Sequence, residues 1–154
     1  MSRQLSTRPA VLADEPFLMR LRRLTMDEHI ERVGKVADDA AHRARVLVNF
    51  EAAKIVCLDG EPIGLLKDYR AENEWMLVQI QLLPEHQGKG FGEQLIRTVL
   101  AQAEAAGLPV ALSVLRGNPA RRLYERLGFR EAEADGGDAF KLVWRPSGIA
   151  SKPV

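Results

Sequence analysis

The feature that most constrains the fold is a glycine-rich loop between a strand pattern and a helix pattern. The apolar run Trp75–Leu83 stops at Pro84, and an amphipathic stretch follows over Gly90–Ala106. Between them stands Gln87-Gly88-Lys89-Gly90-Phe91-Gly92. Glycine permits a positive φ and lets the main chain approach a ligand closely. N–H groups at the start of a helix attract anions, so this unit predicts an α/β chain with a main-chain site for phosphate or pyrophosphate.

Two common phosphate-binding loops do not fit this stretch. A Walker loop places Lys and then Ser or Thr after a longer spacer, whereas Phe91 and Gly92 follow Gly90 here. The dinucleotide fingerprint requires a third glycine where Glu93 stands. On the loop residues alone, a tight turn without any ligand remains the alternative interpretation.

The rest of the chain alternates between extended and helical patterns, with turn signals between them. Asp59-Gly60 predicts a hairpin turn, and Gly107 with Pro109 ends the helix after the glycine loop. The other predicted elements are an extended opening at Gln4–Pro9, helices from Ala10 to Met26 and over Asp38–Phe50, strands at Lys54–Leu58, Ile63–Tyr69 and Val110–Leu115, a helix between Asn118 and Gly128, and strands at Arg130–Ala134 and Ala139–Trp144 around the turn Asp135–Asp138.

Composition limits the classes of partner. The chain has 154 residues, 22 basic and 21 acidic, for a formal net charge of +1, so no general field attracts nucleic acid or an anionic membrane. No apolar run reaches the roughly 20 residues of a membrane helix, and no secretory segment is evident. Cys57 is the single cysteine and is expected to be a small core residue. We expect a cytoplasmic protein without a metal site, with residues 1–146 forming one domain and 147–154 a disordered tail.

A second motif, NPARRLYERLGF, covers Asn118–Phe129. Asn118 and Pro119 form a good N-cap and first-turn pair, and Gly128 ends the helix. Tyr124 lies at the edge of the apolar stripe of this helix, with an apolar ring and a hydroxyl able to reach a cleft. Taken alone, Tyr124 is more simply interpreted as a core aromatic. The basic residues of the helix are either a solvated face or a contact to a ribose phosphate: Arg121, Arg122 and Arg126.

Together, VQIQLLPEHQGKGFG and NPARRLYERLGF resemble the two motifs of the GNAT superfamily of N-acetyltransferases. The resemblance covers nearly the whole chain and is that of a small, single-domain, bacterial-type member. It implies an α/β (α+β) fold with helices on both faces of a mixed central sheet. That sheet would be splayed between strands 4 and 5, Trp75–Leu83 and Val110–Leu115, with the cofactor in the gap. It also implies acetyl transfer from acetyl-CoA, without a metal, to a primary amine of unknown identity by direct attack.

The resemblance carries over roles residue by residue. The loop would hold the pyrophosphate through main-chain amides of Gln87, Gly88, Lys89, Gly90, Phe91 and Gly92. Leu82 and Leu83 would offer main-chain groups to the pantetheine arm, and an N–H near Leu83 would polarise the thioester carbonyl. Asn118 would contact that arm from the other side. Tyr124 would act as the general acid for the leaving thiol.

The acceptor is the least defined part of this prediction. Glu28, His29, Gln79 and Gln81 are the candidate substrate residues, and a water relay is preferred as the base. The acidic residues Glu28, Glu31, Asp38 and Asp39 favour a cationic acceptor, either a small molecule or a peptide amine. A homodimer is left open. The competing function is a non-catalytic acyl-CoA-binding regulatory module, which has no need of an acid such as Tyr124.

Overall fold

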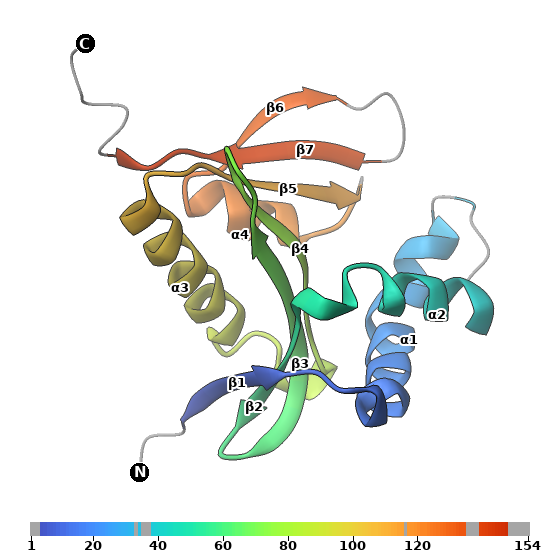
Figure 1. Ribbon diagram of the computed structural model, residues 1–154. Coiled ribbons are helices and arrows are strands. Elements are labelled where there is room, and N and C mark those ends of the chain that lie inside the picture. The colour runs from blue at the N-terminus through green and yellow to red at the C-terminus, as the bar shows by residue number, and fades with distance from the viewer. Residues whose placement is uncertain (1–3, 33, 35–37, 116, 135–138, 148–154) are drawn as a thin grey trace. The chain divides into compact units, whose positions relative to one another are not determined.

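The structure, a computed structural model, describes residues 4–32, 34, 38–115, 117–134 and 139–147 (Figure 1). Seven strands form a mixed sheet in the order β1-β2-β3-β4-β5-β7-β6. The elements are β1 (Leu5–Pro9), η1 (Leu12–Asp14), α1 (Glu15–Arg32), α2 (Asp39–Leu47), η2 (Phe50–Ala52), β2 (Ala53–Leu58), β3 (Glu61–Arg70), β4 (Trp75–Leu82), η3 (Pro84–His86), α3 (Phe91–Ala106), β5 (Val110–Leu115), α4 (Ala120–Arg126), β6 (Arg130–Ala134) and β7 (Ala139–Trp144).

The chain divides into two compact units, which we describe separately. The first unit consists of Met1–Lys67 and Gln79–Gly92, and the second of Asp68–Val78 and Glu93–Val154. The predicted turn at Asp135–Asp138 and the predicted tail from residue 148 onward lie outside the described residues. Ser147, the first residue of the predicted tail, is described, and both its N–H and its hydroxyl donate to Glu104 Oε1, at 3.2 and 3.1 Å.

In the first unit, β1 pairs antiparallel with β2, and β2 pairs antiparallel with β3. The turn between β2 and β3 has φ of 52° at Asp59 and 87° at Gly60. Two consecutive positive φ values match the right-handed twist of a two-residue hairpin, which is why Asp-Gly is favoured there. The predicted hairpin is therefore confirmed.

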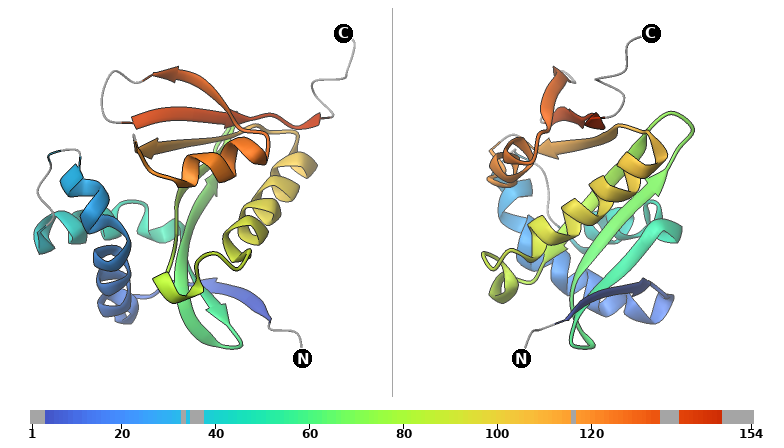
Figure 2. Two further views of the ribbon diagram at one scale, coloured as in Figure 1. Left: turned by 180° about the vertical axis from the view of Figure 1, so that it is seen from behind. Right: turned by 90° about the vertical axis from the view of Figure 1, so that its left-hand side faces the viewer.

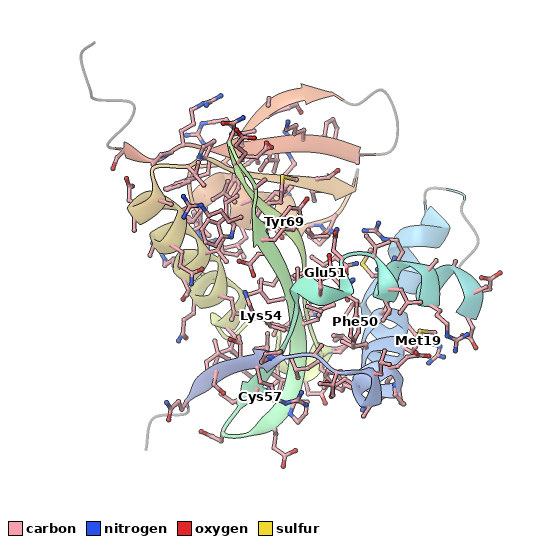
Figure 3. The ribbon with its side chains drawn as sticks, in the orientation of Figure 1. Met19, Phe50, Glu51, Lys54, Cys57 and Tyr69 are labelled. Atoms are coloured by element: carbon pink, nitrogen blue, oxygen red, sulfur yellow. The ribbon has the colours of Figure 1, made fainter. Side chains whose placement is uncertain are left out.

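The helices α1 and α2 of this unit pack on an apolar cluster shared with the strands. Cys57 belongs to the cluster and is 5% exposed, so its prediction as a core residue is confirmed. Half-buried Phe50 packs against it; Figure 3 labels Phe50, Cys57 and a further member, Met19. The buried members are Leu18, Met19, Leu21, Val46, Ala53, Ile55, Cys57, Leu65 and Leu83.

A buried lysine connects α2 to the sheet. Lys67 of β3 is 0% exposed, and its Nζ donates to the carbonyl oxygens of Arg45 at 2.9 Å, Val46 at 2.8 Å and Val48. The last carbonyls of a helix have no partner within the helix, and a cation is favourable at that end. Lys67 therefore supplies both the hydrogen bonds and the charge that the end of α2 requires.

The helix predicted over Asp38–Phe50 is shorter than expected. α2 ends at Leu47, and Asn49 adopts a left-handed φ of 53° before the short helix η2 begins at Phe50. The sequence placed Phe50 on the apolar face of this helix. Phe50 does pack against the core cluster, but it does so from η2. At the other end, Asp38 caps α2 by accepting from the N–H of Ala41 at 2.8 Å.

In the second unit, β4 and β5 run parallel and pair at their first residues, Trp75 with Val110 and Met76 with Ala111. β5 pairs antiparallel with β7, and β7 with β6, and these three strands run side by side in every view (Figure 2). The expected mixed sheet is thus confirmed, and its parallel pair consists of β4 and β5. The predicted apolar stripe of α3 is buried, as expected: Leu95, Ile96, Val99, Leu100 and Ala103.

The burial of Lys67 predicts a pH dependence of stability. Burial is the largest cause that lowers its pKa, from 10.5 to about 8. Between these values the unfolded chain binds more protons than the folded chain, so the stability contributed by Lys67 rises as pH rises through this window. A shift of this size corresponds to about 3 kcal/mol. We therefore expect wild type to gain up to that amount relative to Lys67→Met between pH 8 and 10.5, measured by urea unfolding. A difference independent of pH would contradict the assignment.

Candidate active site

The glycine loop has the backbone conformation that its sequence predicts. Gly88 and Gly90 adopt φ of 74° and 87°, and α3 begins directly afterwards at Phe91. A Cβ added at either glycine would meet nothing within 4 Å. The requirement for glycine therefore comes from the backbone angle, and the space beside both residues is open. Residues 87–90 are all exposed. The N–H of Gln87 is already used, because it donates to the Pro84 carbonyl at 3.2 Å, which corrects its expected role as a pyrophosphate donor.

The main chain before the loop corrects one expectation. The N–H of Leu83 donates to the carbonyl of Ile63 at 2.8 Å, so it is used by the sheet and is not directed at a thioester carbonyl. Because successive residues of a strand direct their polar groups to opposite sides, the Leu82 N–H and C=O point away from β3. The Leu82 carbonyl accepts from Gln87 Nε2 at 3.0 Å, which ties the loop to the end of β4. Leu82, not Leu83, directs its main-chain groups away from β3, as the predicted pantetheine contact requires, and its N–H is the group not engaged by Gln87.

Tyr124 is positioned by the way α4 ends. The N–H of Phe129 donates to the Tyr124 carbonyl at 3.1 Å, and the N–H of Gly128 donates to the Glu125 carbonyl at 3.1 Å. With a φ of 109° at Gly128, these two bonds form a Schellman motif, which brings the residues at its two ends into contact. The rings of Tyr124 and Phe129 meet edge to face with centroids 5.6 Å apart. The Gly-Phe pair of the sequence motif thus fixes the tyrosine ring.

The environment of Tyr124 keeps its hydroxyl protonated. The side chain is 8% exposed, and burial raises its pKa from 10.0 to about 12. At pH 7 the residue is therefore a neutral phenol able to donate a hydrogen bond.

Asn118 organises the start of α4 from outside the helix. Its Oδ1 accepts from the N–H of Ala120 at 2.9 Å, and its main-chain carbonyl accepts from the N–H of Arg121 at 3.2 Å. The predicted N-cap is therefore wrong by one residue, because Pro119 occupies the cap position and the helix begins at Ala120. The Asn118 side chain instead accepts from the first helical N–H. Asn118 remains half-buried.

The candidate acceptor residues fall into two groups. Gln81 is 9% exposed, and Gln79, two residues earlier on β4, is half-buried with its Oε1 buried and without a hydrogen-bond partner. Buried acceptors normally have a partner, so an unsatisfied one on a central strand calls for an explanation. The side chains of Glu28 and His29, on α1, lie outside the described residues, as does that of Glu31.

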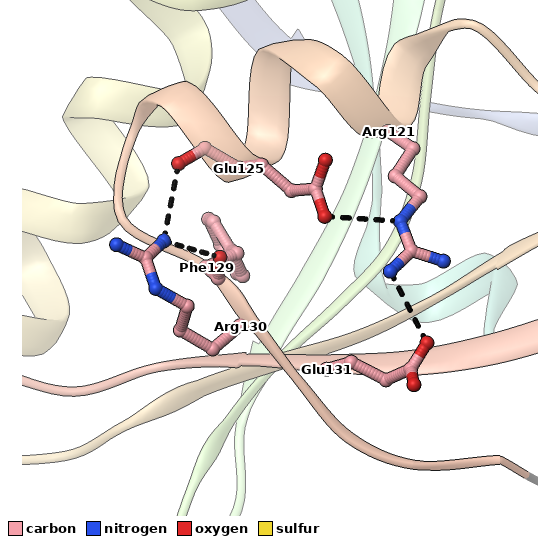
Figure 4. A network of polar contacts seen from close by, with 5 residues as sticks. All are labelled: Arg121, Glu125, Phe129, Arg130 and Glu131. Atoms are coloured by element: carbon pink, nitrogen blue, oxygen red, sulfur yellow. Dashed lines mark hydrogen bonds and ion pairs between the residues drawn. The ribbon is translucent and has the colours of Figure 1, made fainter.

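Most basic side chains of α4 make contacts within the protein. Arg121 bonds Glu125 and Glu131, each at 3.1 Å (Figure 4). Its guanidinium also lies over the ring of Phe140, 4.5 Å from the centroid. Beside this pair, Arg130 donates to the main-chain carbonyls of Glu125 and Phe129 (Figure 4). Arg126 bonds Glu93 at 2.6 Å. These contacts favour a structural role over a ribose phosphate site, except for Arg122, which is exposed.

The described part of the chain offers neither a metal site nor a membrane span. No group of three or more His, Cys, Asp or Glu side chains in it is placed to hold a metal ion. No described helix has the length and apolar character needed to span a bilayer.

Comparison with known proteins assigns the family. A model of the acetyltransferase (GNAT) family matches residues 18–129, well over half of the chain. The chain belongs to the GNAT acetyltransferase family. Among curated proteins, the ribosomal protein bS18-alanine N-acetyltransferase of Haemophilus influenzae is 39% identical over 62 residues. That match spans 40% of this chain and 42% of the relative, so it covers less than half of the relative's length.

Solved structures agree on the fold of this GNAT acetyltransferase. An acetyltransferase from Thermus thermophilus has a TM-score of 0.72 and 25% identity, covering 92% of this chain and 96% of that one. PaiA N-acetyltransferase from Thermoplasma acidophilum, solved in complex with coenzyme A, has a TM-score of 0.72 and 17% identity, covering 92% and 99%. At 17% identity, the likeness to PaiA establishes the fold and not the acceptor.

The Schellman motif at Gly128 gives a prediction with a matched control. Gly107 ends α3 in the same way, with a φ of 70° and nothing within 4 Å of an added Cβ, whereas a Cβ on Gly128 meets Trp144 Cδ1 at 3.1 Å. Alanine in the left-handed region costs about 1–2 kcal/mol. We expect Gly107→Ala to cost that amount of unfolding free energy and Gly128→Ala to cost more, measured by urea unfolding. Equal losses would show that the Trp144 contact is relieved without strain.

Proposed function

We propose that this GNAT acetyltransferase moves an acetyl group from acetyl-CoA to a primary amine by direct attack. The observation that carries the proposal is the pair of left-handed glycines, Gly88 and Gly90, immediately before the start of α3. Their conformation exposes successive main-chain N–H groups next to the positive end of a 16-residue helix. That arrangement suits a pyrophosphate, and the open space beside both glycines leaves room for it.

In this proposal the cofactor is held mainly by backbone. The loop from Gln87 to Gly92 contacts the pyrophosphate, and the edge of Leu82 that faces away from β3 pairs with the pantetheine arm as another strand would. Asn118 contributes its remaining amide N–H donors to the same arm. Acetyl-CoA, when bound, supplies an activated acetyl thioester, so no metal is required for the transfer.

Tyr124 is proposed to assist departure of the thiol. Attack by the amine breaks the carbon–sulfur bond, and the electron pair of that bond passes to sulfur, which then takes up a proton. A phenol with a pKa of about 12 holds its proton more tightly than a cysteine-type thiol does, at about 8.5. Tyr124 is therefore suited to donating a strong hydrogen bond as charge develops on sulfur, and less suited to complete proton transfer.

The amine must lose two protons during the reaction, one before it attacks. For an amine with a pKa near 10.4, deprotonation at pH 7 costs about 4.6 kcal/mol. Gln79 Oε1, a buried acceptor without a protein partner, is proposed to accept a hydrogen bond from the amine and so orient its lone pair. Since an amide is not a base, the protons pass to water.

The loop assignment is tested by calorimetry of CoA binding to Gly90→Glu. The added carboxylate should repel the pyrophosphate, so we expect binding to be lost. Gly60→Glu is the matched control because Gly60 has the same φ of 87° and equally open surroundings, in a hairpin far along the chain. Both variants carry the same backbone strain and the same charge. Equal affinity of the two variants for CoA would refute the assignment.

The role of Tyr124 is tested by Tyr124→Phe, which keeps the ring contact with Phe129. Loss of one hydrogen-bond donor to a developing negative charge typically lowers kcat by about 10²–10³. We expect that loss with unchanged affinity for CoA. Because the phenol titrates near 12, the pH–rate profiles of the two proteins should have the same shape up to pH 10. Full turnover by the Phe variant would leave Tyr124 as a core aromatic.

A further inference from the structure

A carboxylate stands in the first turn of α3, the helix end that is proposed to receive the pyrophosphate. Glu93 is the third residue of α3, directly after the loop that contains Gly88 and Gly90. The first N–H groups of a helix have no acceptor within the helix, and they attract nearby anions. A glutamate at this position commonly turns back to accept from one of them. Glu93 is therefore a competitor of the pyrophosphate for the same donors.

In the structure both oxygens of Glu93 are engaged by arginines. Arg97 Nε, one turn further along α3, donates to Oε2 at 3.0 Å. Arg126 Nη2, from α4, donates to Oε1 at 2.6 Å. The bond from Arg126 is the largest cause that lowers the pKa of Glu93, and the bond from Arg97 is the next. The carboxylate is therefore ionised at neutral pH, and its charge is directed to two guanidinium groups.

The donors of the loop remain open while Glu93 is held in this way. No described residue accepts from the N–H of Gly88, Lys89 or Gly90. The space beside both glycines is also open. A carboxylate that turned back from position 93 would supply an acceptor there and would repel the pyrophosphate. Even in bulk water, two unit charges about 4 Å apart change an affinity by roughly fivefold.

The two arginines contribute to this arrangement differently. Arg97 stands four residues after Glu93 on the same helix, and a pair at this spacing forms in isolated helices too. Arg126 is the last residue of α4, 33 positions along the chain, so its bond requires the folded unit. Both pairs are exposed and individually weak. Loss of the Arg126 bond would therefore release Glu93 for part of the time, although Arg97 remains.

We propose that Arg126 is a positioning residue of the cofactor site, which holds the Glu93 carboxylate away from the N–H groups that bind the pyrophosphate. This inference rests on the proposed binding of acetyl-CoA and adds a residue outside the loop that controls it. Without Arg126, Glu93 turns back to the start of α3 for part of the time and opposes the cofactor. Because the competitor is Glu93 itself, the effect of losing Arg126 depends on the presence of Glu93.

The test is a double-mutant cycle of Arg126→Gln and Glu93→Ala, with CoA affinity measured by calorimetry. Arg126→Gln should weaken CoA binding by about three- to fivefold when Glu93 is present. In the Glu93→Ala background the same change should have a much smaller effect. Loss of a distant positive charge alone would give the same fold-change in both backgrounds, since independent effects add. Equal fold-changes would overturn the proposal.

Two further variants separate positioning from a general effect on the fold. Arg126→Lys should recover part of the affinity, because an ammonium can still donate to Glu93. Arg121→Gln removes the same charge from α4 but breaks ion pairs with Glu125 and Glu131, so its effect should not depend on Glu93. Urea unfolding of the same cycle measures the ion pair itself. Coupling of Arg126 with Glu93 in unfolding but not in CoA affinity would make the contact merely structural and reject the proposal.

Failure of the proposed function is separable from failure of this inference. If wild type does not bind CoA, acetyl transfer itself is rejected, and amide hydrogen exchange of the free protein then decides the role of Arg126. In Arg126→Gln, at least one N–H of Gly90, Phe91 or Gly92 should exchange more slowly than in wild type, because Glu93 accepts from it. The added protection should disappear in the double variant Arg126→Gln/Glu93→Ala. Unchanged exchange at all three amides would overturn the inference.

Discussion

The first unit depends on one contact, in which the ammonium of Lys67 donates hydrogen bonds to the carbonyls at the end of α2. A helix that ends against a sheet leaves several carbonyls without donors, and leaving them buried and unpaired is costly. Water would ordinarily provide those donors, but the site is closed to solvent. Lys67 replaces the water with three N–H groups from the adjacent strand. The position of α2 on the core cluster follows from this contact.

Most of the architecture was predictable because its signals are local. β5, β6 and β7 have the bounds that apolar runs and turn residues indicate, and the buried face of α3 follows its sequence period. The glycines of the loop and of Asp59-Gly60 predict positive φ because few other residues adopt it. The family motifs combine such local signals, which explains why the sequence indicated the class of enzyme.

The remaining features depend on pairings between distant residues. The residues directly before Lys67 in β3 are apolar. They do not indicate that the lysine contacts the end of α2, about twenty residues earlier in the sequence. The engagement of the Leu83 N–H by Ile63 depends on strand register, which composition does not specify. The prediction of a cationic acceptor used acidic residues, and sequence shows charge without showing burial. The structure adds that Asp38 and Asp39 are exposed and that Asp38 caps α2.

Lys67 also bears on how an acetyltransferase avoids modifying itself. Acyl transfer to an amine requires the neutral form, and Lys67 is neutral at a far lower pH than an ordinary lysine. By chemistry alone it would be a favoured target for acetyl-CoA or any acylating reagent. Its burial and its three carbonyl contacts keep it out of reach while α2 stays in place. Acylation at Lys67 would therefore show that α2 has detached from the strand. Mass spectrometry of the acylated chain would detect this opening.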